Sequence, residues 1–144
     1  MVPVRCAIRN AFGENRKMQL TNLIMDLTRE QGGGRETQVQ PPSGVWEQFF
    51  GVRINAARPT FRLVRADTKS IDPEQRKVVK HHHNLTIEIS GAVLPRPAIL
   101  RMRKTGQNSF EYWIYRPPSK AYSHCDWILH NLAVPYPDRR WIVF

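Results

Sequence analysis

Proline and glycine divide this chain into short pieces, and this punctuation constrains the fold more than any other feature of the sequence. Eleven prolines and eight glycines are spread over 144 residues. Several of the pieces between them alternate apolar and polar residues, with the period of two that is typical of β-strands. The clearest example is Asn84–Ser90, in which leucine or isoleucine occupies every second position. The sequence therefore predicts a fold made mainly of short strands.

The pattern predicts strands distributed along the whole chain, at residues 17–28, 37–40, 59–66, 84–90, 98–102, 110–115 and 141–144. Residues 67–83 are rich in polar side chains and are predicted to form a long loop. The segments 98–102 and 110–115 are predicted to pair as a hairpin across residues 104–108. These elements favour a mainly-β domain that forms a closed or nearly closed barrel.

One or two short helices are predicted between the strands. The first begins at Ser43, a favourable N-cap, and ends at Gly51, which can adopt the left-handed conformation of a helix C-terminus. Trp46 and Phe50 form an apolar i,i+4 pair within it. The second helix covers residues 123–132, and its apolar side contains Trp127, Ile128 and Leu132.

The composition is that of one folded domain. Hydrophobic residues make up 41% and aromatic residues 10% of the chain, which argues against intrinsic disorder. No apolar run approaches the roughly 18 residues of a membrane-spanning helix, so no membrane partner is expected. Cys6 and Cys125 form neither a disulfide framework nor a paired metal motif, which favours a reducing, cytoplasmic setting.

The charge balance points to a polyanionic partner. Lysine and arginine number 22 against 12 aspartate and glutamate residues, so the formal net charge is +10. Sixteen of the basic residues are arginine, whose planar guanidinium suits both phosphate and the guanine edge. This composition predicts that the chain binds nucleic acid.

A glycine-rich segment precedes several side chains that can address base edges. Gly32–Gly34 provide backbone freedom, and Arg35, Glu36, Thr37 and Gln38 follow directly. Arginine, threonine and glutamine can contact bases in the major groove, and glutamate can accept a hydrogen bond from cytosine. An exposed loop without a ligand is the alternative interpretation of this segment.

The stretch from Gly33 to Phe50, which contains Pro42-Ser43-Gly44 and a short aromatic helix, resembles the amino-terminal effector domain of EcoRII-type restriction endonucleases. That domain shares its fold with the plant B-three transcription-factor domain. The resemblance extends to the hairpin of residues 98–116. The length of 144 residues predicts a single domain over residues 1–144, and the resemblance implies that this domain can be part of a larger restriction enzyme. The implied fold is a seven-stranded DNA-binding pseudobarrel with one or two short helices.

In the resembled family, two arms grip the major groove of double-stranded DNA. The first arm corresponds to residues 31–38 here and the second to residues 101–108. By position, the residues expected to contact DNA are Arg35, Glu36, Thr37, Gln38, Arg101, Arg103, Lys104, Thr105, Gln107, Asn108 and Arg116. The resemblance implies an effector domain that targets DNA, with nuclease chemistry in a separate domain or subunit. No catalytic residue, cofactor or metal is expected in this chain.

The hairpin is also basic in its own right. Residues 96–120 carry six basic side chains against Glu111 alone. Arg101 and Arg103 are two positions apart and therefore share a strand face. A charged edge hairpin that protects against aggregation is the alternative interpretation. The sequence favours DNA contact, with Arg101, Arg103, Lys104 and Arg116 on one surface.

Two other functions are compatible with the sequence. Asp67-Thr68-Lys69 has the Asp-x-Lys form of metal-dependent nucleases, and Asp26 can provide an earlier carboxylate. An RNA-binding β-barrel with exposed aromatic residues is the other alternative, because residues 110–115 alternate two aromatic rows on opposite faces. His81-His82-His83 does not predict a metal site, since consecutive residues of an extended chain point to alternate sides.

Overall fold

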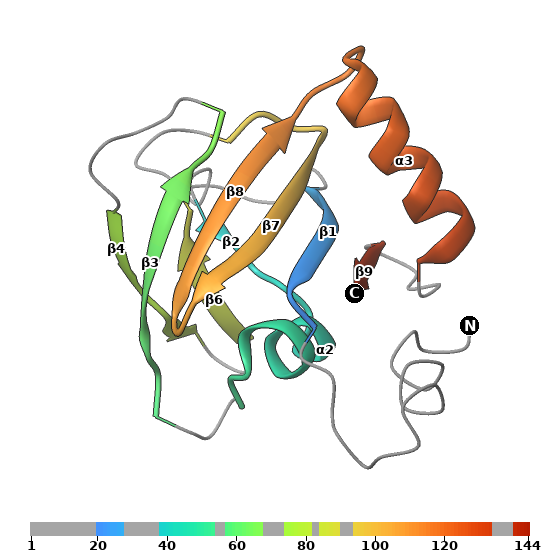
Figure 1. Ribbon diagram of the computed structural model, residues 1–144. Helices are drawn as coiled ribbons and strands as arrows, with labels where there is room; N and C mark the ends of the chain where they lie inside the picture. Colours follow the sequence, from blue (N-terminus) through green and yellow to red (C-terminus); the bar gives the residue numbers. More distant parts are fainter. Residues whose placement is uncertain are drawn as a thin grey trace.

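The computed structural model describes residues 20–27, 38–53, 57–67, 74–81, 84–89, 94–133 and 140–144, and it confirms the mainly-β prediction. Within this part of the chain there are nine strands and two helical regions (Figure 1). The strands are β1 (Asn22–Leu27), β2 (Gln38–Val39), β3 (Thr60–Arg65), β4 (Glu74–Lys77), β5 (Val79–His81), β6 (Asn84–Glu88), β7 (Ala98–Gly106), β8 (Ser109–Tyr115) and β9 (Trp141–Val143).

The strands form a six-stranded sheet and a three-stranded sheet. The six-stranded order is β4-β3-β8-β7-β1-β9, with β3 and β8 parallel and the other neighbours antiparallel. The three-stranded order is β2-β6-β5. β4 pairs with β3 and β5 pairs with β6, and only the fully buried Val78 separates β4 from β5. This continuous segment therefore joins the two sheets into a barrel-like body, in which the six-stranded sheet itself does not close.

The prediction of a loop over residues 67–83 was wrong, because β4 and β5 lie within it. β4 is an edge strand of the six-stranded sheet, and its Gln75 and Lys77 side chains are exposed. Edge strands commonly carry polar and charged residues, which removes the alternation used to recognise a strand. These two strands also explain why the structure has more strands than the seven that the resemblance implied.

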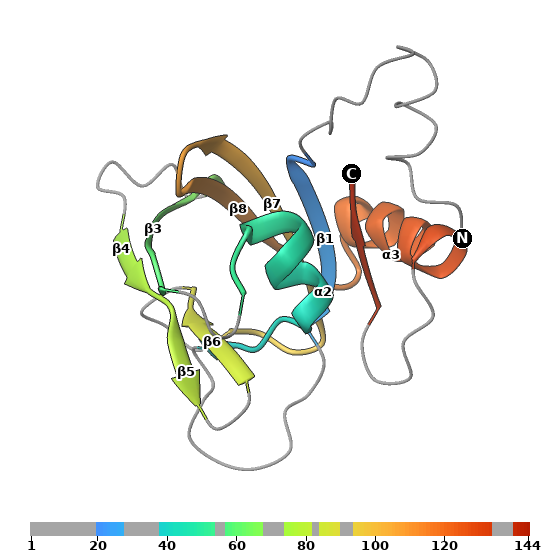
Figure 2. The same ribbon diagram turned by 90° about the horizontal axis from the view of Figure 1, so that it is seen from below.

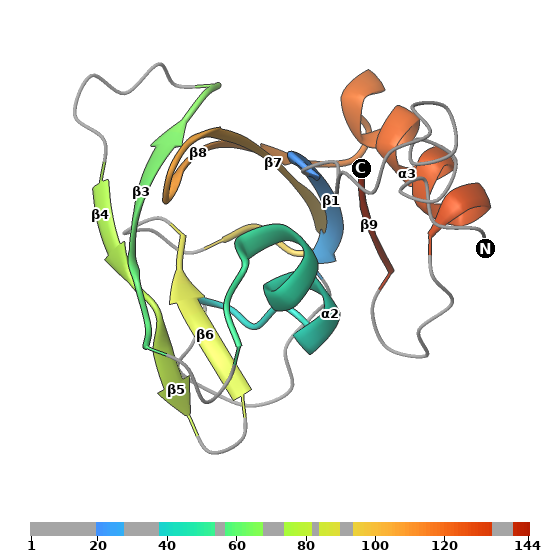
Figure 3. The same cartoon turned by 60° about the horizontal axis from the view of Figure 1, so that its bottom comes forward.

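The inner face of the larger sheet encloses an aromatic core. Phe61 and Phe110 lie on neighbouring strands, with ring centroids 5.0 Å apart. Phe110 contacts both Phe49 and Phe50, and Phe61 contacts Phe50, with ring centroids 5.2 to 5.3 Å apart. Phe49 and Phe50 belong to a short helical segment composed of α2 (Ser43–Val45) and a π-helical turn η1 (Trp46–Phe50). Figures 2 and 3 show this segment inside the curve of the sheet. The helix therefore packs into the interior of the barrel against the inner face of the sheet.

The boundaries of this first helix differ from the prediction at one end. Gly51 ends it with φ of 71°, as expected. Pro42, rather than Ser43, occupies the N-cap position, and its carbonyl accepts hydrogen bonds from the amides of Val45 and Trp46 at 3.0 and 3.2 Å. A proline carbonyl can serve this role, since only the N–H is missing from that residue.

The second helix, α3 (Lys120–Leu132), covers part of the outer face of the same sheet. It begins after Ser119, whose Oγ accepts a hydrogen bond from the Tyr122 amide at 3.2 Å. The residues packed between the helix and the sheet are Ile24, Ile99, Cys125, Leu129 and Ile142. No helix in the described part of the chain is both long and apolar enough to span a membrane.

The predicted apolar side of α3 was wrong for Trp127 and Leu132, whereas Ile128 does pack against the residues between helix and sheet. Trp127 and Leu132 are 61% and 45% exposed, whereas Cys125 and Leu129 are buried. The isoleucines of β1, β7 and β9 decide which helical face is buried, because they present their side chains at the outer surface of the sheet. Those partners are distant in sequence, so the helix pattern alone could not identify the buried face.

Candidate nucleic-acid interface

The described residues on either side of the glycine-rich segment, Leu27 and Gln38, lie at one end of the barrel. Leu27, the last residue of β1, pairs with Ala98 at the start of β7. Gln38, the first residue of β2, accepts a hydrogen bond at its carbonyl oxygen from Arg96 Nη2 at 2.9 Å. Both neighbours of residues 28–37 are therefore anchored on the short segment 96–98. Arg35, Glu36 and Thr37 lie outside the described residues.

The same end carries the turn from β8 to α3. Tyr115 pairs with Ile99, so Arg116 follows directly beside the start of β7. The Arg116 and Lys120 side chains are exposed, and the Arg116 carbonyl accepts a hydrogen bond from Ser119 Oγ at 2.7 Å. We call this region, composed of Leu27, Gln38, residues 96–98 and residues 116–120, the arm end. The β8–α3 turn and the start of β7 lie at the top of the molecule in Figure 1.

The turn of the β7–β8 hairpin lies at the opposite end of the barrel. β7 runs for nine residues from Ala98, which places Gly106 roughly 26 Å from the arm end at 3.3 Å per residue. Gln107 and Asn108 form the exposed turn, in which Asn108 has φ of 54°. Its carbonyl accepts a hydrogen bond from the Arg62 amide at 2.8 Å, so the turn is also attached to β3.

The prediction that residues 31–38 and 101–108 form two arms of one grip stays a prediction, since residues 31–37 lie outside the described residues. The described neighbours of that segment, Leu27 and Gln38, lie at the end of the barrel opposite the β7–β8 turn. Thr105, Gln107 and Asn108 are exposed at the hairpin end, while Gln38 lies at the arm end and is partly buried. The register of β1 against β7 separates them, and local sequence does not reveal that register.

The four basic residues predicted to share a surface are also divided. Arg101 and Arg103 do share the outer face of β7, where the Arg101 Cζ lies 4.7 Å from the Trp113 ring centroid and Arg103 pairs with Glu111. Lys104 is on the other face, with its Nζ 5.9 Å from the centroid of the buried Phe110 ring. Burial lowers the pKa of this lysine. Arg116 belongs to the arm end.

Arg96 is a residue whose role the sequence analysis did not identify. It was counted only as part of the basic hairpin, yet its guanidinium holds the backbone at Gln38, 58 positions away. A hydrogen bond from a charged donor to a backbone carbonyl is stronger than a neutral one. Because the acceptor is a main-chain atom, no side-chain pattern in the sequence indicates this contact.

The carboxylates proposed for a nuclease do not converge. Asp26 accepts hydrogen bonds from Arg140 at 2.6 and 3.1 Å, and Arg140 also binds Asp126 at 2.7 Å. The bond to Asp26 raises the pKa of the Arg140 guanidinium. Asp67 follows β3 and contacts Arg65 instead. Since β7 and β8 lie between β1 and β3, the two aspartates are separated by three strand spacings, or about 14 Å.

A metal site is likewise not assembled in the part of the chain that the structure describes. No group of three histidine, cysteine, aspartate or glutamate residues there could hold an ion. Lys69 lies outside the described residues, as do His82 and His83. The arginine-bridged aspartates Asp26 and Asp126 instead connect β1 to α3, which gives them a structural role.

Comparisons with known proteins support the fold. No protein-family model matches the sequence, and no curated protein matches it. The structure is similar to the N-terminal domain of Helicobacter pylori LlaJI.R1, with a TM-score of 0.59 and 7% sequence identity. The match covers 84% of this chain and 97% of that one. The chain therefore has the fold of a restriction-enzyme N-terminal domain, which agrees with the broader part of the predicted resemblance without selecting the EcoRII type.

Proposed function

We propose that this chain binds double-stranded DNA through its arm end and recognises a specific sequence there. The observation that carries the proposal is the anchoring of both neighbours of residues 28–37 on the segment 96–98. The proposed base readers Arg35, Glu36 and Thr37 therefore belong to a segment whose two described neighbours, Leu27 and the fourth proposed reader Gln38, are both attached to the β scaffold at the arm end. The net charge of +10 supports a polyanionic partner, and the fold supports a restriction-enzyme domain.

The arm end offers two kinds of contact. Arg35, Glu36, Thr37 and Gln38 are the proposed base readers, because their donors and acceptors match base edges in the major groove. Arg116 and Lys120 are exposed beside the anchors and are the proposed phosphate contacts. In this arrangement the β8–α3 turn replaces the β7–β8 hairpin as the second contact with the duplex.

The proposed biological role is that of an effector domain of a restriction endonuclease. The separated, arginine-paired aspartates support a division of labour in which a nuclease domain or subunit cleaves the DNA. The domain described here then delivers that nuclease to its target sequence.

Two variants test this proposal, one in the proposed reading segment and one at the β7–β8 turn. Arg35→Ala should weaken binding to the preferred duplex by roughly 1–3 kcal/mol and binding to random duplex much less, since one base contact is lost. Gln107→Ala, at the exposed hairpin turn, should leave both affinities unchanged. Fluorescence anisotropy with labelled duplexes measures both. A loss of preference in Gln107→Ala, with Arg35→Ala unaffected, would place the reader at the hairpin end.

A further inference from the structure

A second basic surface lies on the outer face of the six-stranded sheet, away from the arm end. α3 covers the outer face over Ile24, Ile99 and Ile142, whereas no described helix or strand covers the face over β4, β3, β8 and the adjacent part of β7 (Figure 1). We call this region, together with Phe144 at the end of β9, the outer strip. The cations and aromatic residues that it presents are Arg62, Lys77, Arg101, Arg103, Trp113 and Phe144.

The strand registers place these six residues on one face. In β3, Phe61 and Leu63 are buried inward, so Arg62 points outward, and Lys77 lies opposite the exposed Thr60. Arg101 and Arg103 flank the inward Met102. These alternations leave four cationic groups on the same surface.

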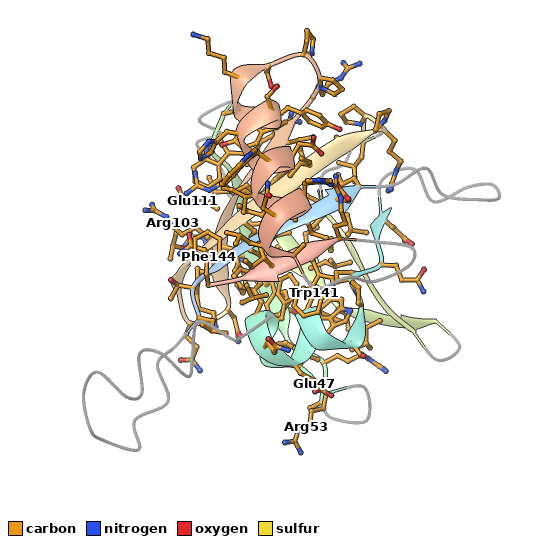
Figure 4. The ribbon with its side chains drawn as sticks, turned by 90° about the vertical axis from the view of Figure 1, so that its right-hand side faces the viewer. Glu47, Arg53, Arg103, Glu111, Trp141 and Phe144 are labelled. Atoms are coloured by element: carbon orange, nitrogen blue, oxygen red, sulfur yellow. The ribbon has the colours of Figure 1, made fainter. Side chains whose placement is uncertain are left out.

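The two aromatic residues bracket the arginines of β7. Trp113 lies directly opposite Arg101 on β8. Phe144 is hydrogen-bonded through its backbone to Asn22, whose cross-strand partner is Arg103. Phe144 is 38% exposed, although large apolar side chains are usually buried. Figure 4 shows Arg103, Glu111 and Phe144 close together on one side of the molecule.

The charge of the outer strip is strongly positive. Among its described side chains Glu111 is the one carboxylate, against the four cations, and it is paired with Arg103. The Arg101 guanidinium lies over the Trp113 ring, so it keeps its positive charge and adds a second planar group to the ring. A single-stranded nucleic acid matches this surface, because its phosphates can contact the cations and its unpaired bases can stack on the aromatic rings.

We propose that the outer strip binds single-stranded nucleic acid, at a site distinct from the arm end. The sheet curves away from this face, as Figure 3 shows, so a rigid duplex touches it only over a short length. A flexible single strand can follow the curve. Stacking on Phe144 and on the Arg101–Trp113 pair also requires bases whose faces are free, which a duplex does not offer.

The test uses a short fluorescein-labelled oligothymidylate and fluorescence anisotropy. The wild-type chain should bind it, and Trp113→Ala should weaken this binding at least about fivefold, as expected for the loss of one stacked base. Trp127→Ala is the matched control, because Trp127 is an exposed tryptophan on α3, outside the outer strip. It should leave the affinity unchanged. Trp113→Phe keeps a ring at the same position and should restore much of the binding.

Three results would overturn this proposal. They are no binding of the oligothymidylate by the wild type, equal weakening by Trp113→Ala and Trp127→Ala, and complete competition by an equal concentration of random duplex. Duplex affinity of Trp113→Ala, measured in parallel, serves as the folding control and should equal that of the wild type. Arg35→Ala should bind the oligothymidylate normally, so a failure of the arm-end proposal remains distinguishable from a failure of this one.

Discussion

At the scale of single residues, Arg96 connects the chain before β7 to Gln38, the residue that follows the proposed reading segment of residues 28–37. Its Nη2 donates to the Gln38 carbonyl, and the same short stretch of chain pairs with Leu27 through Ala98. Together with the pairing of Gln38 with Glu88 on β6, this side chain fixes the position at which the chain enters β2. A residue in this position affects recognition without touching a base.

Arg96→Ala should reduce the preference for the selected duplex over random duplex while binding to random duplex changes little. The physical reason is that the reading side chains lose a fixed position, whereas the phosphate contacts remain. Loss of a charged hydrogen bond should also lower the free energy of unfolding by about 1.5–3 kcal/mol. Anisotropy with both duplexes and a urea titration measure the two effects. An unchanged preference at reduced stability would limit Arg96 to a structural role.

At the scale of elements, the helical segment α2–η1 packs tightly against β9 at Gly44 and Trp141. A Cβ placed on Gly44 would lie 2.8 Å from Trp141 Cζ2, closer than packed carbon atoms approach. Trp141 is buried, so its ring cannot easily move aside. The glycine is therefore required for the helix to sit inside the barrel.

Gly44→Ala should destabilise the domain by about 1–3 kcal/mol, the usual cost of an overpacked methyl group. Gly106→Ala is the matched control, because its Cβ would meet only Ser109 Cβ, at 3.8 Å. Thermal melts of both variants give the comparison. Equal melting temperatures for the two variants would show that the helix does not pack against β9 in this way.

The elements also show which parts of the fold the sequence could predict. Alternation predicted β3 and β6, and the aromatic spacing predicted the helix that ends at Gly51, because those signals are local. β4 and β5 could not be predicted, since their buried partners are on β3 and β6 rather than in their own polar pattern. The buried side of α3 likewise depends on isoleucines from three strands.

For the candidate site too, local sequence signals identified the residues, but long-range pairing decides how they are arranged. Residue types predicted the glycine-rich segment and the basic hairpin as candidate contacts. The register of β1 against β7 places Leu27, which precedes the glycine-rich segment, at the end opposite the hairpin turn, and the partner of Arg96 is a backbone atom. Long-range pairing, which a single sequence does not reveal, therefore decides which candidates can act together.

At the scale of the whole molecule, charge contributes through phosphate contacts whose number can be measured. Each phosphate neutralised by a basic side chain steepens the fall of log affinity with log salt by about 0.9 on duplex DNA. Arg116→Ala should flatten this slope by about one unit and leave sequence preference intact. Lys77→Ala is a control of equal charge on β4, in the outer strip, and should leave the duplex slope unchanged. Identical flattening in both variants would mean that the duplex is held by diffuse charge.

The central claim is that the domain recognises a particular duplex sequence, and selection of binding sites from a random duplex library tests it most directly. The wild-type chain should enrich one short motif over successive rounds, and Arg35→Ala should blunt that enrichment at one or two positions of the motif. Recovery of bound duplexes without any enriched motif would contradict the claim, because it would leave the chain as a basic protein that binds DNA through its phosphates alone.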